Sequence, residues 1–364
     1  MSWAIWVTGL PGSGKSALAR AAAERLQARG VAVRVLELDA IRKIVTPAPT
    51  YSDTEREAVY RLLAFMAGTL VAAGVPVIVD ATAHRRRWRE LARELIPRFA
   101  EVQLACPLAV CREREATRAP GHAPRDIYAR AGAASTTVPG VDREYEPALA
   151  PELVIDTTAD DVTAGAARIV ALADRLATGS PALTGHDGGW AIWITGRPGS
   201  GKTTIARQVA NALTASGLTV TIVEAGALRR LVWPVAGGSL DDLVHRAIVC
   251  LTKLLVEAGI AVIVDSTAHQ RRWRDLARDL IPRFAEIQLH CPADLCAERE
   301  RAARWHLGDS ASGPCVATPD VEVDLVLDYE PGLRPELTIY TDVQDCMTAV
   351  DQVLFVARRL QRRS

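Results

Sequence analysis

Residues 3–16 read Trp-Ala-Ile-Trp-Val-Thr-Gly-Leu-Pro-Gly-Ser-Gly-Lys-Ser, and residues 190–203 read Trp-Ala-Ile-Trp-Ile-Thr-Gly-Arg-Pro-Gly-Ser-Gly-Lys-Thr. In both stretches an apolar run, typical of a buried strand, leads directly into the pattern Gly-x-x-x-x-Gly-Lys-Ser/Thr. Glycines let backbone N–H groups turn inward around a phosphate, and the helix that follows adds the positive end of its dipole. Because this whole context occurs twice, the sequence predicts two phosphate-binding loops (P-loops) that hold a nucleoside triphosphate.

Each polar residue of the loops has an expected role. Lys15 and Lys202 would reach the outer phosphates, and the hydroxyl groups of Ser16 and Thr203 would bind Mg²⁺. ATP and Mg²⁺ are therefore the expected cofactors. The other residues expected to contact the nucleotide are Gly9, Pro11, Gly12, Ser13 and Gly14 in the first loop and Gly196, Gly199, Ser200 and Gly201 in the second.

A carboxylate ends a Val-Ile-Val-Asp run in each half of the chain. These residues are Asp80 and Asp265, and either could hold Mg²⁺ through water from the end of its strand. We therefore expect one metal site to combine Ser16 with Asp80 and the other to combine Thr203 with Asp265.

The composition narrows the class of protein. Of the 364 residues 49% are hydrophobic, which supports full-sized cores, and the 43 Lys and Arg balance the 43 Asp and Glu. A net charge of zero argues against a whole-protein electrostatic grip on nucleic acid. The basic runs 84–89 and 358–363 are interpreted as solvated helix faces, with nucleic-acid contact left open for the first.

Cysteines and apolar stretches bear on the compartment. The seven cysteines include no Cys-x-x-Cys pair, so they predict neither a zinc site nor a disulfide framework and fit a reducing cytosol. The longest uncharged stretch, residues 62–79, is interrupted by Gly74 and Pro76. The chain enters its first predicted strand without a secretory signal. We expect a cytoplasmic protein without a membrane span.

Strands and helices alternate along the first half. Strands are expected at residues 3–8, 31–38, 75–79, 100–105 and 153–156, and helices at residues 17–29, 53–73, 86–96 and 159–176. Continuous Val and Ile runs separated by helices indicate the α/β class, a parallel β-sheet with helices on both faces. Ligands of such sheets bind beyond the carboxyl ends of the strands.

The second half repeats the first. Residues 86–101 recur as residues 271–286 with only Glu→Asp exchanges, which indicates tandem duplication of a whole domain. The stretch between the halves has the Gly-, Ser- and Pro-containing composition of a linker. We expect two tandem domains of the P-loop NTPase type, at residues 1–177 and 189–364, joined by a linker at residues 178–188.

Five further segments of the first half carry a family resemblance. They are residues 36–42 (Leu-Glu-Leu-Asp-Ala-Ile-Arg), 51–56 (Tyr-Ser-Asp-Thr-Glu-Arg), 111–115 (Cys-Arg-Glu-Arg-Glu), 129–132 (Ala-Arg-Ala-Gly) and 140–157, which contains Gly-Val-Asp-Arg-Glu-Tyr-Glu-Pro. In this order after the P-loop they resemble the adenylylsulfate kinase (APS kinase) family. The resemblance implies transfer of phosphate from ATP to the 3′-hydroxyl of adenosine 5′-phosphosulfate.

The resemblance also implies roles on the acceptor side. Asp39 would orient or deprotonate the acceptor hydroxyl and act with Lys15 as a catalytic residue, although it could also cap the helix that follows. Arg42 and Arg56 would hold the phosphosulfate through forked hydrogen bonds. Val138 takes the place of an aromatic residue that is expected to stack on the acceptor adenine.

On the nucleotide side the resemblance implies a role for one further arginine. Arg114 would lie over the bound nucleotide, and Arg299 is its counterpart in the second half.

Departures from the family pattern leave other acceptors open. Asp80 stands where the family usually has a neutral residue, and residues 77–82 resemble the broader group of P-loop kinases that includes polynucleotide kinases. Val59 replaces the family's Asn, and residues 127–129 lack its lysines. The alternatives are a kinase for another hydroxyl acceptor, such as a polynucleotide end, and a non-catalytic nucleotide sensor.

Several partners are expected from the same reasoning. They are a small-molecule substrate, a sulfurylase that supplies it, and a second kinase-like domain, which is either the other half of this chain or a second copy in a homodimer.

The second copy is degenerate on the acceptor side. Gly226 occupies the position of Asp39, and residues 235–242 contain no clear acceptor arginine, whereas the P-loop and Asp265 remain. We therefore expect an active N-terminal kinase and a C-terminal domain that binds nucleotide and serves regulation or pairing.

Replacing the loop lysines one at a time tests this division. Lys15→Ala should abolish phosphoryl transfer because it removes the cation at the outer phosphates of the active domain, whereas Lys202→Ala should leave at least part of the activity. The measurement is the rate of ADP formation with acceptor present. Equal losses in the two variants would contradict the assignment.

Overall fold

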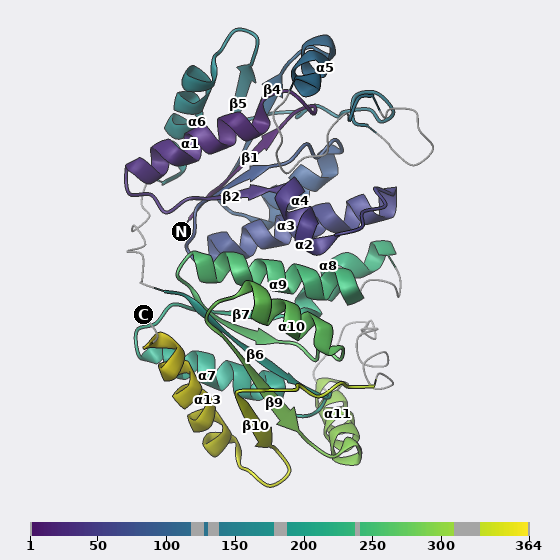
Figure 1. The fold of residues 1–364 in the computed structure, drawn as a ribbon, viewed down its shortest axis with the longest axis vertical. Coiled ribbons are helices and arrows are strands. Elements are labelled where there is room, and N and C mark those ends of the chain that lie inside the picture. The colour runs from purple at the N-terminus through teal and green to yellow at the C-terminus, as the bar shows by residue number, and fades with distance from the viewer. Residues whose placement is uncertain are drawn as a thin grey trace. The chain divides into compact units, whose positions relative to one another are not determined.

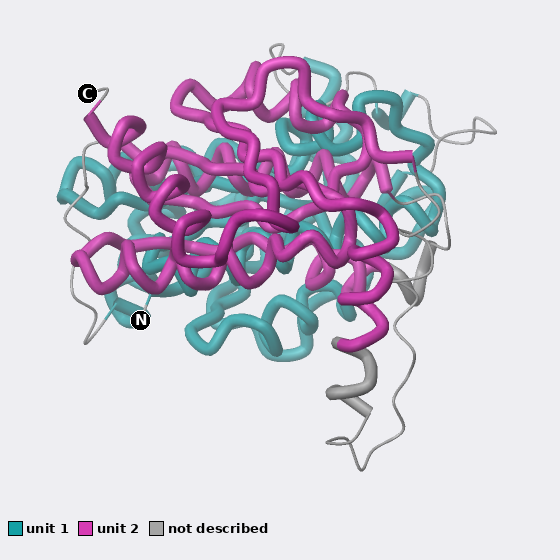
Figure 2. Tube along the Cα trace, turned by 90° about the horizontal axis from the view of Figure 1, so that it is seen from below, with its two compact units in different colours: residues 1–185 teal, residues 186–364 magenta. Residues whose placement is uncertain are grey.

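A computed structural model describes residues 2–117, 127–129, 138–177, 188–236, 241–308 and 328–362. The chain divides into two compact units, residues 1–185 (unit 1) and residues 186–364 (unit 2), which Figure 2 colours separately. Except for Gly188, the predicted linker at residues 178–188 lies outside the described residues.

Unit 1 contains a parallel five-stranded sheet. Its strands are β1 (Ala4–Thr8), β2 (Arg34–Glu37), β3 (Val77–Asp80), β4 (Phe99–Ala105) and β5 (Leu153–Asp156). They lie in the order β2-β3-β1-β4-β5, and every neighbouring pair is parallel. The carboxyl ends of all these strands therefore meet at one edge, where β1 continues into the first P-loop.

Helices cover both faces of this sheet, which confirms the predicted α/β class. They are α1 (Lys15–Ala28), α2 (Leu38–Val45), α3 (Asp53–Ala72), α4 (Arg86–Leu95), α5 (Leu108–Ala116) and α6 (Val162–Ala177). Helix α1 packs beside α6, and α3 packs beside α4 (Figure 1). Ile5 and Val7 of β1 pack with α1 and α6, whereas the indole N–H of Trp6, which alternates with them, donates to Ala81 O at 3.1 Å.

Unit 2 repeats this architecture with a second parallel sheet in the equivalent order β7-β8-β6-β9-β10. Its strands are β6 (Trp190–Gly196), β7 (Val220–Glu224), β8 (Ala261–Asp265), β9 (Phe284–His290) and β10 (Leu337–Tyr340). Its helices are α7 (Lys202–Ala215), α8 (Ala225–Ala236), α9 (Asp241–Glu257), α10 (Arg271–Leu280), α11 (Ala293–Gly308) and α13 (Cys346–Gln361).

The second strand of unit 1 is shorter than predicted, and this moves Asp39. The sequence predicts a strand over residues 31–38, whereas β2 ends at Glu37 and α2 begins at Leu38. Glu37 is the N-cap of α2, so the expectation that Asp39 could cap this helix is wrong. Asp39 lies instead in the first turn, where a carboxylate interacts favourably with the helix dipole.

A buried arginine connects α4 to the rest of unit 1. The Arg89 side chain is fully buried; its Nε donates to Glu101 on β4 at 2.5 Å, and its two Nη atoms donate to Ala83 O and to Glu146 O. In unit 2 the buried Arg274 makes the equivalent ion pair with Glu286 at 2.8 Å. The interpretation of run 84–89 as a solvated helix face is therefore wrong for Arg89.

The other arginines of this run also contact groups within unit 1. Arg85 pairs with Asp53 at 3.5 Å, Arg87 pairs with Glu57, and the Arg86 side chain donates to Pro147 O at 3.0 Å. These contacts are intramolecular, and they argue against a basic surface reserved for nucleic acid.

The length and apolar character of the helices bear on membrane insertion. Among the described residues, none of the helices combines the length and apolar character that a membrane span requires.

Removing the buried guanidinium should destabilise unit 1. Arg89→Ala leaves the Glu101 carboxylate buried without its cation, a change that costs about 3–5 kcal/mol of unfolding free energy. Urea unfolding is the measurement, with Arg29→Ala as control. Arg29 pairs with Asp174 at the surface, where both side chains are about half exposed, and its loss should cost much less unfolding free energy than the loss of Arg89. Equal losses of unfolding free energy in the two variants would show that the buried ion pair stabilises the unit no more than the exposed one.

Candidate active site

The first P-loop connects β1 to α1 and is built on glycines with positive φ. Gly12 has a φ of +77° and Gly14 a φ of +97°, a region that residues with a Cβ rarely adopt. A Cβ on Gly12 would also lie 2.2 Å from the carbonyl oxygen of Cys111 on α5. Gly199 of the second loop meets Cys296 in the same way. The glycine pattern is thus required both by the turn and by the close approach of a neighbouring helix.

The loop lysines lie over their own loops. The Nζ atom of Lys15 donates to Leu10 O at 2.9 Å, and the Nζ atom of Lys202 donates to Arg197 O at the same distance. Each ammonium group is therefore positioned at the mouth of the phosphate cradle.

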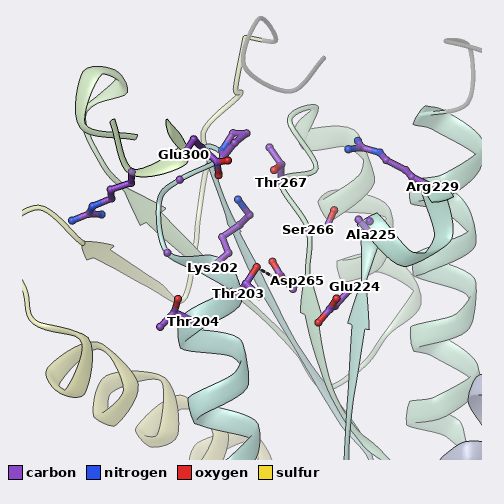
Figure 3. Close-up of a pocket in the computed structure, with 15 residues that line it drawn as sticks. Lys202, Thr203, Thr204, Glu224, Ala225, Arg229, Asp265, Ser266, Thr267 and Glu300 are labelled. Carbon is purple, nitrogen blue, oxygen red and sulfur yellow. Dashed lines mark hydrogen bonds between the residues drawn. The ribbon is translucent and has the colours of Figure 1, made fainter. Parts of the chain in front are cut away.

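The residues expected to hold Mg²⁺ are in contact with each other. Thr203 Oγ1 donates to Asp265 Oδ2 at 2.6 Å (Figure 3), and the Ser16 hydroxyl hydrogen-bonds to Asp80 in unit 1. Burial raises the pKa of Asp80 above its ordinary value, opposed by the nearby Lys15 ammonium and by the Ser16 hydroxyl. Paired hydroxyl and carboxylate oxygens are a donor set that suits Mg²⁺.

These oxygens would be only part of the coordination of the metal. In the part of the chain that the structure describes, no group of three or more His, Cys, Asp or Glu side chains could hold a metal ion. Phosphate oxygens and water would therefore complete the shell, as is usual for Mg²⁺ with nucleotides.

On the acceptor side the structure brings the two predicted arginines together. Arg42 is buried and pairs with Glu55 at 2.9 Å, and the Nε atom of Arg56 donates to Tyr51 O at 2.9 Å. Both guanidinium groups lie near the Tyr51 ring, at 5.1 and 5.6 Å from its centroid. Burial raises the pKa of Tyr51, and the charge of Asp39, the predicted catalytic residue, adds to this rise.

Tyr51 and Glu55 are residues of this site that the sequence did not single out. Tyr51 has a φ of +53°, which is strained for a residue with a Cβ. Glu55 holds the strained turn because it accepts from Thr50 N at 2.6 Å and from Tyr51 N at 3.3 Å. The only hint in the sequence was their place in the segment 51–56.

The two arginines expected over the nucleotide have the same contacts in both units. An Nη atom of Arg114 donates to Thr157 O at 2.7 Å, and an Nη atom of Arg299 donates to Thr341 O at 2.8 Å. Arg299 lines a cavity together with the second P-loop. These contacts position the guanidinium groups between α5 or α11 and the end of an edge strand.

Between α5 and β5 the structure describes residues 127–129 and the stretch that begins at Val138. Tyr128 donates to Pro11 O of the P-loop at 2.7 Å, a contact that sequence reasoning missed. Val138 is buried, its N–H donates to Asp142 at 2.9 Å, and its carbonyl oxygen accepts in a turn through Gly140. Of residues 129–132, only Ala129 lies within the described part of the chain.

In unit 2 the carboxyl edge of the sheet is hollowed into a cavity of about 500 Å³ (Figure 3). It is lined by P-loop residues, by the strand-end residue Asp265, and by Gly226 and Arg229 at the start of α8. The positions that correspond to Asp39 and Arg42 therefore face the same space as the P-loop.

Comparison with known proteins bears directly on this arrangement. The family model described as adenylylsulphate kinase matches residues 1–156 and again residues 188–310. The chain belongs to the adenylylsulphate kinase family. It is accordingly a kinase, and the two matched ranges agree with a tandem duplication.

Individual relatives align with a length that corresponds to one unit. A probable adenylyl-sulfate kinase of Archaeoglobus fulgidus is 36% identical over 162 residues, which are 44% of this chain and 99% of that protein. An adenylyl-sulfate kinase of Bacillus licheniformis is 37% identical over 160 residues, 43% of this chain and 76% of the relative.

Among solved structures, the APS kinase of Mycobacterium tuberculosis in complex with AMPPNP and APS is 28% identical. The match covers 48% of this chain and 98% of that one, with a TM-score of 0.42.

An aromatic stack lies near Arg42 and Arg56 in unit 1. The Tyr60 and Trp88 rings stack at 4.1 Å, and His84 meets Trp88 edge-on at 4.9 Å. Burial lowers the pKa of His84 to about 4, so the folded protein holds its ring neutral at pH 7. Burial likewise lowers the pKa of His245 in unit 2 to about 3.

The lowered pKa of His84 predicts a pH dependence of stability. Between pH 6.5 and about 4 the unfolded chain binds a proton that the folded chain excludes, so stability falls as the pH is lowered through this window. His84→Phe should reduce this loss, since neither His84 ring nitrogen has a hydrogen-bond partner among the residues that the structure describes. Denaturant unfolding at several pH values measures it.

The control for this series is His290→Phe, because His290 is exposed at the end of β9. An unchanged pH slope in His84→Phe would contradict the assignment of the proton to His84.

Proposed function

We propose that unit 1 transfers the terminal phosphoryl group of ATP to the 3′-hydroxyl of adenosine 5′-phosphosulfate. The observation that carries the proposal is the meeting of Arg42, Arg56 and Tyr51 beside the helix turn that carries Asp39. A kinase needs an acceptor site next to its P-loop, and this cluster supplies cations for an anionic acceptor. The family to which the chain belongs supports the same substrate.

Phosphoryl transfer depends on positioning and charge neutralisation more than on covalent chemistry. The N–H groups of the first loop and the Lys15 ammonium would bind the phosphates of ATP. Mg²⁺ held by Ser16 and Asp80 would supply further neutralisation of phosphate charge. Asp39 would accept or orient the proton of the acceptor hydroxyl.

Two arginines supply cations on the acceptor side. The guanidinium groups of Arg42 and Arg56 lie in one cluster around Tyr51 with the carboxylates of Glu55 and Asp39. Burial lowers the pKa of Arg56, but an arginine whose ordinary pKa exceeds 12 remains charged at neutral pH. Charge-assisted hydrogen bonds from these two guanidinium groups suit a phosphosulfate better than a neutral polyol.

The alternative of a polynucleotide end has less support. Three of the four arginines in run 84–89 pair with carboxylates within the unit, namely Arg85 with Asp53, Arg87 with Glu57 and Arg89 with Glu101. A non-catalytic sensor would need neither the acceptor arginines nor Asp39.

We further propose a cytoplasmic setting in sulfate assimilation. The six described cysteines are free thiols, which suits a reducing compartment. A sulfurylase would have to supply adenosine 5′-phosphosulfate. Pairing between the two units, or between two copies of the chain, stays a prediction.

Asp39→Asn tests the mechanism. We expect the wild type with Mg·ATP and adenosine 5′-phosphosulfate to form ADP and 3′-phosphoadenylylsulfate, and the variant to lose about 10²–10⁴-fold in kcat because no carboxylate accepts the proton. Chromatography of the nucleotides measures both products. The control is Asp174→Asn, which changes a half-exposed surface carboxylate.

ATP binding by the wild type without a phosphorylated product would reject adenosine 5′-phosphosulfate as the acceptor. Full activity of Asp39→Asn would reject the role of Asp39 and leave the substrate standing.

A further inference from the structure

One hydrogen bond fixes the register of the long helix that flanks each acceptor side. In unit 1 the indole N–H of Trp88 donates to Glu57 on α3 at 2.7 Å. In unit 2 the indole N–H of Trp273 donates to Asp242 on α9 at 2.8 Å. Because the two tryptophans occupy the same place in the duplicated stretch, Glu57 and Asp242 correspond.

The strand register fixes a second correspondence. Glu37 lies opposite Asp80 at the end of β2, and Glu224 lies opposite Asp265 at the end of β7. Five residues further along, unit 1 has Arg42 and unit 2 has Arg229. The two arginines therefore correspond as well.

The charge that faces this arginine is reversed in unit 2. Arg56 precedes Glu57, whereas Asp241 precedes Asp242. Asp241 forms an ion pair with Arg229 at 3.0 Å. The position that gives unit 1 its second guanidinium group gives unit 2 a carboxylate, and this carboxylate neutralises the cation that remains.

The acceptor side of unit 2 has lost its proton acceptor too. Gly226 lines the cavity at the position where unit 1 has Asp39. Figure 3 shows Arg229 on the far side of this cavity from Lys202. With Gly226 in place of Asp39 and Asp241 in place of Arg56, this half of the cavity does not suit the acceptor.

The nucleotide side of unit 2 is intact by contrast. Lys202 lies over the loop at 2.9 Å from Arg197 O, and Thr203 and Asp265 are joined at 2.6 Å, as a site for Mg·nucleotide requires. Lys202, Thr203 and Asp265 line the cavity of about 500 Å³, a volume in the range of small-ligand pockets.

Two buried hydroxyl groups next to the second loop, one of which lines this cavity, have no hydrogen-bond partner among the described residues. Ser200 of the loop and Ser266 at the end of β8 are almost fully buried, and neither Oγ atom has a hydrogen-bond partner within the described residues. Ser266 lines the cavity, and unit 1 has Ala81 at its position. Buried polar groups are rarely left unpaired unless water or a ligand satisfies them.

We propose that unit 2 is a second nucleotide site that binds Mg·ATP without transferring its phosphate, because its acceptor half has Gly226 and Asp241 in place of Asp39 and Arg56. The contrast with unit 1 rests on the function proposed above, but nucleotide binding by unit 2 does not. Ser266 is a hydrogen-bonding group specific to this second site.

Equilibrium dialysis of the full chain with Mg·AMPPNP tests the nucleotide half of the proposal. The wild type should bind two equivalents, and Lys15→Ala and Lys202→Ala one each. Thr203→Val provides a second variant of unit 2, and the thermal unfolding of each variant checks that it folds. A single equivalent in the wild type, lost in Lys15→Ala and kept in Lys202→Ala, would overturn the proposal.

Dialysis of adenosine 5′-phosphosulfate in the presence of Mg·ADP tests the acceptor half. We expect one equivalent per chain, abolished by Arg56→Ala and unaffected by Arg229→Ala. Two equivalents would overturn the claim that unit 2 excludes the acceptor. No acceptor binding, with two equivalents of AMPPNP, would reject the substrate proposed for unit 1 and support the second nucleotide site.

Ser266→Ala in the Lys15→Ala background gives a readout confined to unit 2. Loss of one hydrogen bond to the ligand should weaken AMPPNP binding about fivefold to tenfold. Ser2→Ala is the matched control, because its hydroxyl group is also buried without a partner but precedes β1 in unit 1. Equal affinities for the Ser266→Ala variant and its parent would remove Ser266 from the site.

Discussion

The buried guanidinium group of Arg89 is the interaction on which the carboxyl edge of unit 1 depends. It joins α4 to β4 through Glu101, to the turn after β3 through Ala83 O, and to the segment before β5 through Glu146 O. Tyr145, next to Glu146, in turn reaches the end of β1 at 3.0 Å from Thr8. Burying a charge is costly, and here several charge-assisted hydrogen bonds offset the cost. The segments that surround the P-loop are thus held by one cation.

Duplication has preserved this framework and altered the chemistry above it. Arg274 repeats the buried ion pair of Arg89 in unit 2, with the same partners on the strand and in the two loops. At the positions proposed for the acceptor, Asp39 and Arg56 of unit 1 are replaced by Gly226 and Asp241 in unit 2. On the proposed assignment, a phosphoryl donor site and an acceptor site can diverge independently, since they are carried by different strand ends on a common scaffold.

The sequence predicted the parts of this structure that depend on local chemistry. The P-loops follow from glycines whose positive φ is a property of single residues, and the parallel sheet follows from the alternation of apolar strands with helices. The burial of Arg89 was missed because a run of four arginines reads as polar, although Trp88 and Ala92 mark the same helix face as buried. Tyr51 was missed because a strained turn held by Glu55 has no local signature. The correspondence of Asp241 with Arg56 was missed because it depends on the register of α9, which is fixed by the contact between Asp242 and the distant Trp273.

The two tryptophans that set this register have different neighbours. Trp88 stacks on Tyr60, whereas Trp273 stacks on His245 at 4.0 Å with the rings nearly parallel. Each indole is buried immediately behind the acceptor side of its unit, and the partner ring differs in chemistry. Two of the eight tryptophans of the chain, at equivalent positions of the duplication, therefore have different aromatic surroundings and should differ in intrinsic fluorescence.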